Sequence, residues 1–150
     1  MYIYIGALFL SLFISYLTTP YVKKFAYRIG ALDFPEQRRI NDYPMPNLGG
    51  IAIYLAYLTA VLIFSPFNSL TAGLLAGGSF IMILGLVDDL YEISPGLKLL
   101  GQIIAAVILL IFGIEIEFIT NPFGGMIYLG YWGIPLTILW IVGITNTLNL

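Results

Sequence analysis

The sequence contains no cysteine and no histidine, and only 9% of its residues are charged. Without cysteine there is no disulfide framework, and the composition indicates nothing about the redox compartment. Without histidine the chain lacks the commonest metal ligand and the usual proton shuttle at neutral pH. A bound metal would need oxygen ligands, which favours magnesium, manganese or calcium over zinc.

Apolar residues dominate the chain instead. Hydrophobic residues make up 60% of the 150 residues, and the mean hydropathy is +0.97. An ordinary soluble domain carries about 25% charged residues, and a soluble fold of this length could not hide so much apolar surface. Several runs reach roughly the 18 residues that suffice to cross a bilayer. The composition therefore predicts an integral membrane protein.

Five membrane spans are predicted, at residues 3–19, 48–66, 70–87, 97–114 and 132–150. They are expected to be helices, because unpaired backbone groups find no partner in lipid. Pro20 is expected to end the first helix, and Ser94 and Pro95 are expected to begin the fourth as N-cap and first helical residue. The amino terminus is interpreted as an uncleaved span rather than a signal peptide, because no basic residue precedes its apolar core.

Between the fourth and fifth spans, the segment EIEFITNPFGGMIYLG alternates polar and apolar residues around Asn121-Pro122 and Gly124-Gly125. This pattern predicts a small external β-hairpin. The predicted fold class is an all-α polytopic membrane protein with five transmembrane helices and one hairpin. Residues 1–150 are expected to form a single transmembrane domain.

The cations indicate how the chain is oriented. All six lie in two segments that the alternation of spans places on one side of the membrane: Lys23, Lys24, Arg28, Arg38, Arg39 and Lys98. Short loops rich in Lys and Arg stay on the cytoplasmic side. The amino terminus is therefore predicted to lie outside, and the ionisable groups gather at the cytoplasmic face.

Asp88 and Asp89 follow an uncharged run at the predicted cytoplasmic end of the third span. Solvated residues at a span boundary are the simplest interpretation of such a pair. The carboxylates would, however, lie at the carboxyl end of a helix, where the macrodipole disfavours negative charge by about 0.3–1 kcal/mol each. Because adjacent like charges also repel, a nearby cation or a divalent metal is expected to relieve them. If the helix continues for another turn, Glu92 would join the pair as a third oxygen ligand.

The basic segment before the second span allows two interpretations of its cations. Lys23 and Lys24 are interpreted as topology signals only. Arg38 and Arg39 precede the proline- and glycine-rich segment NDYPMPNLGG, and paired arginines held by a stiff turn suit bidentate phosphate binding.

Two glycine pairs are also informative. Gly49 and Gly50 permit close approach to a ligand or to a neighbouring helix, and helix packing is slightly preferred. Gly77 and Gly78 are predicted to pack helices against each other.

Three segments resemble a known family in their order and spacing. They are LDFPEQRRINDYPMPNLGGIAI at residues 32–53, GLVDDLYEISPGLKLLGQ at 85–102 and ITNTLNL at 144–150. The chain resembles the polyprenyl-phosphate N-acetylhexosamine-1-phosphate transferases of glycosyltransferase family 4. More narrowly, it resembles the amino-terminal part of a bacterial undecaprenyl-phosphate GlcNAc-1-phosphate transferase.

The resemblance implies a reaction in which undecaprenyl phosphate displaces UMP from a UDP-N-acetylhexosamine. GlcNAc-1-phosphate is the expected group transferred, in the first membrane step of a cell-envelope glycan pathway such as cell wall, lipopolysaccharide or other polysaccharide synthesis. Mg²⁺ is the expected cofactor, with Mn²⁺ as an alternative. The expected partners are the two substrates and the lipid bilayer, without nucleic acid, and a homodimer is left open. The implied location is the bacterial cytoplasmic (inner) membrane.

The resemblance also implies roles for individual residues. Asp88 and Asp89 would be the catalytic acidic pair and the metal ligands. One of them would hold the metal or diphosphate, and the other would accept the proton of the lipid phosphate or orient that phosphate; which does which is left open. Arg38, Arg39 and Lys98 would bind phosphate groups, and Asn146 and Asn149 would bind the nucleotide.

The chain departs from the family pattern in two respects. Asn41 stands where family members usually have histidine, which weakens the assignment of this loop to phosphate binding. The sequence also reaches only the start of the third motif. The 150 residues are therefore expected to be the amino-terminal part of an enzyme with about twice as many spans, and to have little or no transferase activity alone.

Two other functions fit parts of the sequence. Asp88-Asp89 followed by Glu92 is also typical of intramembrane prenyltransferases, but those enzymes need a second acidic cluster, which the sequence does not show. A transporter fragment would place polar residues near the middle of the membrane, whereas here they are predicted at one face. Both alternatives rank below the phosphosugar transferase.

Single cysteines at Gln37 and Asn121 test the predicted topology, because the chain has no native cysteine to interfere. A membrane-impermeant maleimide should label the Asn121 variant in intact cells and the Gln37 variant only in inverted vesicles. Labelling of both positions from the same side would reject the five-span arrangement.

Overall fold

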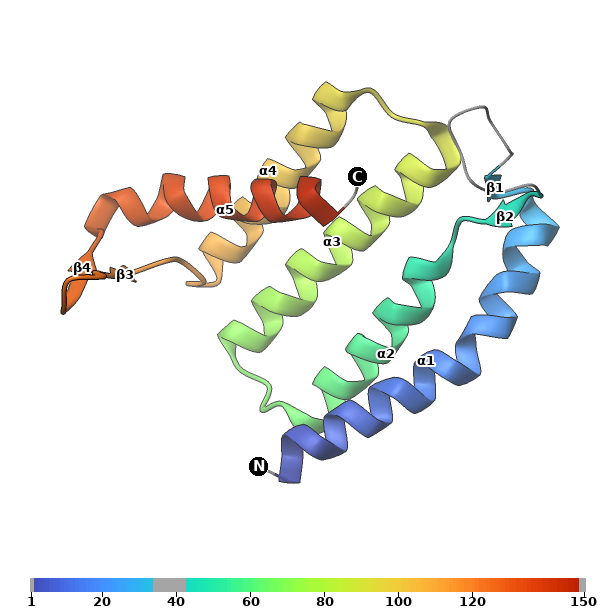
Figure 1. Cartoon of the computed structure of the whole chain (residues 1–150), viewed down its shortest axis with the longest axis horizontal. Coiled ribbons are helices and arrows are strands. Elements are labelled where there is room, and N and C mark those ends of the chain that lie inside the picture. The colour runs from blue at the N-terminus through green and yellow to red at the C-terminus, as the bar shows by residue number, and fades with distance from the viewer. Residues whose placement is uncertain (1, 34–42, 149–150) are drawn as a thin grey trace. The chain divides into compact units, whose positions relative to one another are not determined.

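The computed structural model describes residues 2–33 and 43–148, and these residues are mainly helical (Figure 1). Its helices are α1 (Tyr2–Ile29), α2 (Gly49–Phe64), α3 (Ser69–Tyr91), α4 (Pro95–Ile111) and α5 (Gly133–Leu148), with a short 3₁₀ turn at Gly130–Trp132. Two small antiparallel ribbons join them: β1 (Leu32–Asp33) with β2 (Met45–Pro46), and β3 (Phe118–Thr120) with β4 (Met126–Tyr128). The chain is an all-α membrane protein.

The chain divides into two compact units. Unit 1 contains residues 1–67 and 85–92, and unit 2 contains residues 68–84 and 93–150. Unit 1 therefore includes α1, α2 and the last turns of α3. Unit 2 includes the first part of α3 together with α4, the β3–β4 ribbon and α5.

Two of the described helices are long and apolar enough to cross a membrane, α1 with 28 residues and α3 with 23. The helices α2, α4 and α5 have 16, 17 and 16 residues. At about 1.5 Å per residue they are roughly 24–26 Å long, somewhat shorter than a hydrocarbon core of about 30 Å. The span count of five stays a prediction.

The prediction that Pro20 ends the first helix is wrong, because Pro20 lies inside α1. Proline removes one backbone donor, but an apolar environment offers the chain no better alternative than to remain helical. Nearby hydroxyls donate to carbonyls of the preceding turn: Thr18 Oγ1 to Ile14 O at 2.8 Å, and Thr19 Oγ1 to Ser15 O at 2.6 Å. The helix tolerates the missing bond and continues for nine more residues, to Ile29.

The actual end of α1 is made by Gly30. Its φ of 73° lies in the left-handed region, which glycine adopts without steric cost. The Ala31 N–H then donates to Ala26 O at 3.0 Å, as in a Schellman motif. Lys23, Lys24 and Arg28 consequently lie on the last two turns of α1 rather than in a loop, where positive charge complements the helix dipole.

Unit 1 is held together by small residues. On α2, Ala52, Ala56 and Ala60 are buried at a spacing of four residues, whereas the large side chains of α1 such as Leu8 and Phe13 are each 58% exposed. Small residues let helix backbones approach closely in lipid. A second cluster of Ala26, Ala31 and Leu48 closes the end of the unit that carries β1 and β2.

In unit 2, the first part of α3 packs antiparallel to α4 through glycines. A Cβ on Gly77 would lie 2.8 Å from Leu109 Cδ2, and one on Gly101 would lie 2.6 Å from Leu84 Cδ1. The predicted packing role of Gly77 is confirmed. Ser69 Oγ donates to Phe112 O at 3.1 Å and so binds the start of α3 to the end of α4.

The helices α4 and α5 also run antiparallel, as two hydrogen-bonded contacts show. At the middle of α4, Gln102 bonds to Asn146 near the end of α5. Beyond the end of α4, Ile116 N donates to Thr137 Oγ1 in the first turns of α5 at 2.9 Å. The β3–β4 ribbon lies between the two helices in sequence, in the segment where a hairpin was predicted. That it lies outside the cell stays a prediction.

Substitution of Gly73 by alanine should destabilise unit 2. The new Cβ would lie 2.6 Å from Phe112 Cβ, an atom next to the backbone that cannot rotate away, and overpacking of this kind typically costs about 1–3 kcal/mol. Gly85→Ala, on the same helix, is the control, because its Cβ would meet no atom within 4 Å. Thermal unfolding in detergent should show a lower midpoint for Gly73→Ala only; equal midpoints would contradict the packing described here.

Candidate functional site

The predicted acidic pair lies on the last turn of α3, in unit 1. Asp88 is half-buried and Asp89 is exposed. The helix ends at Tyr91, and the Glu92 N–H closes it by donating to Asp88 O at 2.8 Å. Two carboxylate residues therefore follow each other in sequence at the carboxyl end of a helix, where the macrodipole disfavours negative charge.

Glu92 does not continue this helix. Its φ of 47° makes it the one non-glycine residue with positive φ in the described part of the chain. A left-handed residue directs the chain away from the helix axis, so the extra turn that would align Glu92 with the pair is absent. In the described ranges, no group of three or more Asp and Glu side chains is placed to hold a metal ion. The three-carboxylate arrangement is therefore wrong, and the pair alone remains.

The end of α3 packs against residues that flank the β1–β2 ribbon, before and after the segment that contains Arg38 and Arg39. Leu86, two residues before Asp88, contacts the cluster of Ala26, Ala31 and Leu48. Ala31 directly precedes β1 and Leu48 directly follows Asn47, whose N–H donates to Ala31 O at 3.2 Å. Unit 1 thus brings Asp88 and Asp89 to the end of the unit where the base of this loop is formed.

The β1–β2 ribbon was not predicted, and it forms that base. Leu32 pairs with Pro46 and Asp33 with Met45. Arg38 and Arg39, as well as Gln37 and Asn41, lie in the segment 34–42, outside the described residues. A two-residue strand carries too little alternation to be recognised from sequence.

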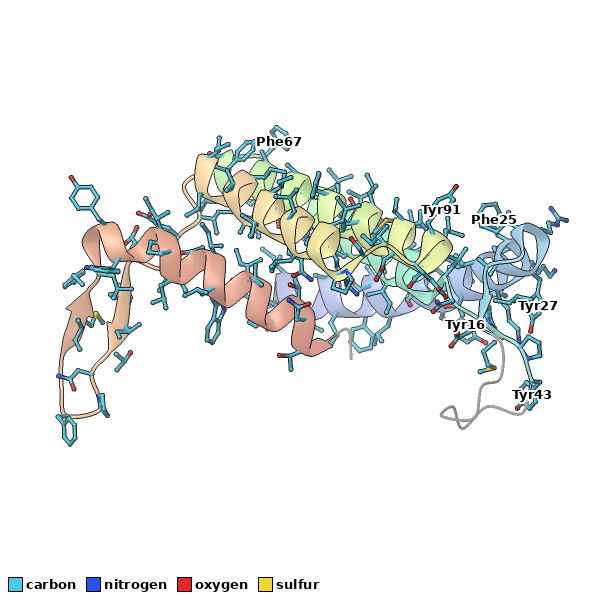
Figure 2. The ribbon with its side chains drawn as sticks, turned by 90° about the horizontal axis from the view of Figure 1, so that it is seen from above. Tyr16, Phe25, Tyr27, Tyr43, Phe67 and Tyr91 are labelled. Atoms are coloured by element: carbon cyan, nitrogen blue, oxygen red, sulfur yellow. The ribbon has the colours of Figure 1, made fainter. Side chains whose placement is uncertain are left out.

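Aromatic side chains surround the same end of unit 1. Figure 2 shows Phe25, Tyr27, Tyr43 and Tyr91 toward the β1–β2 end, with Phe67 far from them. Tyr27 is about half exposed, and Tyr43 is largely exposed. Tyrosine side chains, with a polar tip on an apolar ring, suit membrane–water interfaces.

Unit 2 carries two of the other predicted site residues, Lys98 and Asn146. Lys98 is half-buried in the first turn of α4, a helix capped as predicted by Ser94, whose Oγ accepts from Leu97 N at 3.4 Å, with Pro95 at its first position. Asn146 is exposed near the end of α5. Because α4 and α5 are antiparallel, both residues lie at the same end of this helix pair. Asn149 lies outside the described residues.

Sequence reasoning singled out Gln102 only as part of a motif, yet it bonds directly to Asn146. Gln102 Nε2 donates to Asn146 Oδ1 at 3.2 Å, and Asn146 Nδ2 donates to Gln102 Oε1 at 2.8 Å. Gln102 is 97% buried, with an exposed fraction of 3%. The signal was present in the sequence, because a glutamine within an apolar span needs a hydrogen-bond partner on another helix.

Other features do not contribute to this site. A Cβ on Gly49 or Gly50 would meet no atom within 4 Å, so the helix packing preferred for these glycines is not found among the described residues.

A hollow of about 360 Å³ lies along α5, lined by Leu139, Trp140, Gly143, Ile144 and Thr147. None of its lining residues is a predicted site residue, and its wall is almost wholly apolar.

The chemistry of the acidic pair suits magnesium. Mg²⁺ usually keeps several waters and takes one or two carboxylates together with the phosphates of a substrate, so a third protein carboxylate is not required. Asp88, which is half-buried, and Asp89, which is exposed, are two such carboxylates at the carboxyl end of α3. The donor set fits the predicted cofactor, and manganese would accept the same oxygen ligands.

Comparison with known proteins gives the family of the chain. The family described as "Glycosyl transferase family 4" matches residues 71–150, which include Asp88, Asp89, Lys98 and Asn146. The chain belongs to glycosyl transferase family 4. No solved structure is significantly similar to it.

Three curated relatives of this family 4 chain illustrate the similarity. A Bacillus subtilis protein named "Probable undecaprenyl-phosphate N-acetylglucosaminyl 1-phosphate transferase" is 38% identical over 96% of this chain and 41% of its own length. The decaprenyl-phosphate N-acetylglucosaminephosphotransferase of Mycolicibacterium smegmatis is 34% identical over 75% of this chain and 30% of its own. A phospho-N-acetylmuramoyl-pentapeptide-transferase of Caldanaerobacter subterraneus is 30% identical over 87% and 45%. The family 4 chain thus spans less than half the length of each of these three.

Replacement of Glu92 separates its backbone role from a metal role. Glu92→Gly should raise the free energy of unfolding by about 0.5–1 kcal/mol, because glycine adopts the left-handed conformation at no steric cost. Glu92→Val should lower it by about 1–3 kcal/mol. Thermal unfolding measures both changes. Magnesium affinity, measured by titration, should be the same for Glu92→Gly as for the unchanged chain. A weaker affinity would show that Glu92 contributes to magnesium binding.

Proposed function

We propose that this chain is part of an enzyme that transfers N-acetylglucosamine 1-phosphate from a UDP-sugar to a polyprenyl phosphate, with undecaprenyl phosphate as the acceptor. The observation that carries the proposal is the acidic pair Asp88-Asp89 at the end of α3, inside the segment that matches glycosyl transferase family 4. The names of the similar Bacillus and Mycolicibacterium proteins support a polyprenyl-phosphate acceptor and an N-acetylglucosamine phosphate group.

In the proposed reaction, an oxygen of the lipid phosphate attacks the β-phosphorus of the UDP-sugar. A new P–O bond forms, and the bond between the β-phosphorus and the bridging oxygen of the diphosphate breaks. UMP leaves with that oxygen, and the product is a lipid-linked sugar diphosphate. Phosphoryl transfer of this kind depends mostly on positioning and charge neutralisation. Bound Mg²⁺ would supply neutralisation of the diphosphate charge.

The residues of this chain would act by holding and orienting the substrates. Asp88 and Asp89 would hold the metal, or one of them would orient the lipid phosphate or take its proton. Lys98 has a positive charge at the amino-terminal end of α4, where the helix dipole also favours phosphate groups. Asn146 would bind the nucleotide. Arg38 and Arg39 would contribute further phosphate contacts from the loop whose base is the β1–β2 ribbon.

The proposed location is the bacterial inner membrane, with the reacting groups on the cytoplasmic face and the amino terminus outside. The aromatic residues around the β1–β2 end of unit 1 support a position at headgroup depth. A lipid phosphate lies at that depth, while a nucleotide sugar arrives from water, so a site there can reach both. Assembly as a homodimer stays open within this proposal.

The two alternative functions, an intramembrane prenyltransferase and a transporter fragment, gain no support. The intramembrane prenyltransferase rested on Asp88, Asp89 and Glu92 acting together, and among the described residues no three acidic groups are placed to hold a metal. Membership of family 4 weighs against both that enzyme and a transporter.

Removal of either carboxylate tests the proposal. In membranes that carry the complete reading frame containing these residues, Asp88→Asn and Asp89→Asn should each lower magnesium-dependent UMP release by about 10²–10³-fold, the usual effect of deleting one preorganised electrostatic group. UDP-N-acetylglucosamine and undecaprenyl phosphate are the substrates.

Glu117→Gln is the matched control, because it also removes a carboxylate, from the segment just before β3, and it should retain full activity. Unchanged UMP release in both aspartate variants would remove the catalytic assignment. Release without undecaprenyl phosphate would instead indicate hydrolysis of the nucleotide sugar.

A further inference from the structure

The amide pair between α4 and α5 has a defined hydrogen-bond direction. Asn146 Nδ2 donates to Val142 O at 2.9 Å as well as to Gln102 Oε1 at 2.8 Å. A backbone carbonyl only accepts hydrogen bonds, so it decides which end of the Asn146 amide is the nitrogen. Gln102 must then turn its oxygen toward Asn146 Nδ2 and its nitrogen toward Asn146 Oδ1.

In this arrangement the Asn146 side chain can accept one more hydrogen bond but cannot donate another. An asparagine amide has two N–H donors and an oxygen with two lone pairs. Both donors are used, one by Val142 and one by Gln102, while Oδ1 accepts only from Gln102 Nε2 in the described contacts. Asn146 is exposed, so its remaining lone pair can meet a ligand. The residue therefore presents an acceptor, and not a donor, to that ligand.

The position of Gln102 makes it suited to hold the Asn146 side chain in the orientation that Val142 O selects. It is 97% buried and is the only polar side chain on α4 after Lys98. A buried amide without its partner is costly in an apolar helix pair, so Gln102 and Asn146 hold each other in a single orientation. Lys98 lies four residues before Gln102, on the same face of α4. An acceptor and a positive charge consequently lie toward the same end of the α4–α5 pair.

We propose that Gln102 is a positioning residue that fixes Asn146 as a hydrogen-bond acceptor for the nucleoside part of the UDP-sugar. The matching donor groups are the ribose hydroxyls and the imide N–H of uracil, while Lys98 serves the phosphates. This inference rests on the proposed function of the chain. It adds a residue to the site and assigns the polarity of the contact that Asn146 makes.

Kinetics in membranes that carry the complete reading frame test the proposal with three variants. Gln102→Met keeps an unbranched side chain of similar length but removes the amide. It should raise the KM for UDP-N-acetylglucosamine about tenfold, the effect of losing about 1.4 kcal/mol of binding. The kcat and the KM for undecaprenyl phosphate should change less than about twofold.

Asn146→Ala and the double variant Gln102→Met/Asn146→Ala show whether Gln102 acts through Asn146. If it does, the double variant should have the same KM as Asn146→Ala alone, because positioning a side chain that is absent has no effect. Additive effects of the two substitutions would contradict the proposal.

Thr137→Val is the matched control for helix packing. It removes the bond from Ile116 N to Thr137 Oγ1, which joins the other end of the same helix pair, and it should lower the thermal unfolding midpoint without raising the KM for the nucleotide sugar. An equal rise in KM for Thr137→Val and Gln102→Met would mean that Gln102 only holds the helices together.

If Gln102→Met fails to accumulate in membranes, Gln102→Glu replaces it, because a carboxyl group keeps an oxygen acceptor for Asn146 Nδ2. Its KM should stay within about threefold of the unchanged protein, and a tenfold rise would overturn the proposal.

The outcomes separate this inference from the proposed function. A raised KM in Asn146→Ala with an unchanged KM in Gln102→Met would refute the role of Gln102 and leave the function standing. An unchanged KM in Asn146→Ala would refute the nucleotide contact and the inference together. The function itself would still be decided by the aspartate variants.

Discussion

Lipid as the solvent determines how this chain packs. Its buried positions are occupied mainly by small residues, such as Ala52 and Ala56 on α2 and Ala105 and Ala106 on α4, while large side chains such as Leu12 and Phe13 face outward. In water this distribution would be unfavourable, because burial of large apolar groups is what stabilises a soluble core. In a bilayer the outward leucine side chains are already solvated, and helices associate through close contact of small residues. The same constraint explains why Leu109 can pack directly over Gly77.

Because lipid offers no hydrogen bonds, internal polar groups of this chain bond to partners within the protein. Thr18 and Thr19 donate to carbonyls one turn back around Pro20, Thr137 accepts from Ile116, and the amides of Gln102 and Asn146 bond reciprocally. None of the described buried side-chain nitrogen or oxygen atoms lacks a partner. Hydrogen bonds of this kind hold helix pairs in one register, and near the end of α5 that register also orients a group proposed to contact the nucleotide.

The predicted site residues fall into two groups, an acidic group in unit 1 and a basic, amide-containing group in unit 2. In unit 1 the packing of Leu86 brings Asp88 and Asp89 to the base of the loop that contains Arg38 and Arg39. In unit 2 the antiparallel pairing of α4 and α5 brings Lys98 to the same end as Asn146.

From the sequence alone, the membrane class, the helices, the cap of α4, the packing of Gly77 and the family resemblance followed, because composition, Ser94-Pro95 and a specific motif are local properties. Tertiary structure decided the rest. The helix α1 continues through Pro20 and ends before Gly30, and α3 ends before Glu92, which is therefore not aligned with the acidic pair. The β1–β2 ribbon is also formed by contacts between separate segments. Tertiary structure also paired Gln102 with Asn146, residues separated by 44 positions. These outcomes depend on which groups a neighbouring helix or turn offers as partners, and that information becomes available only when distant segments meet.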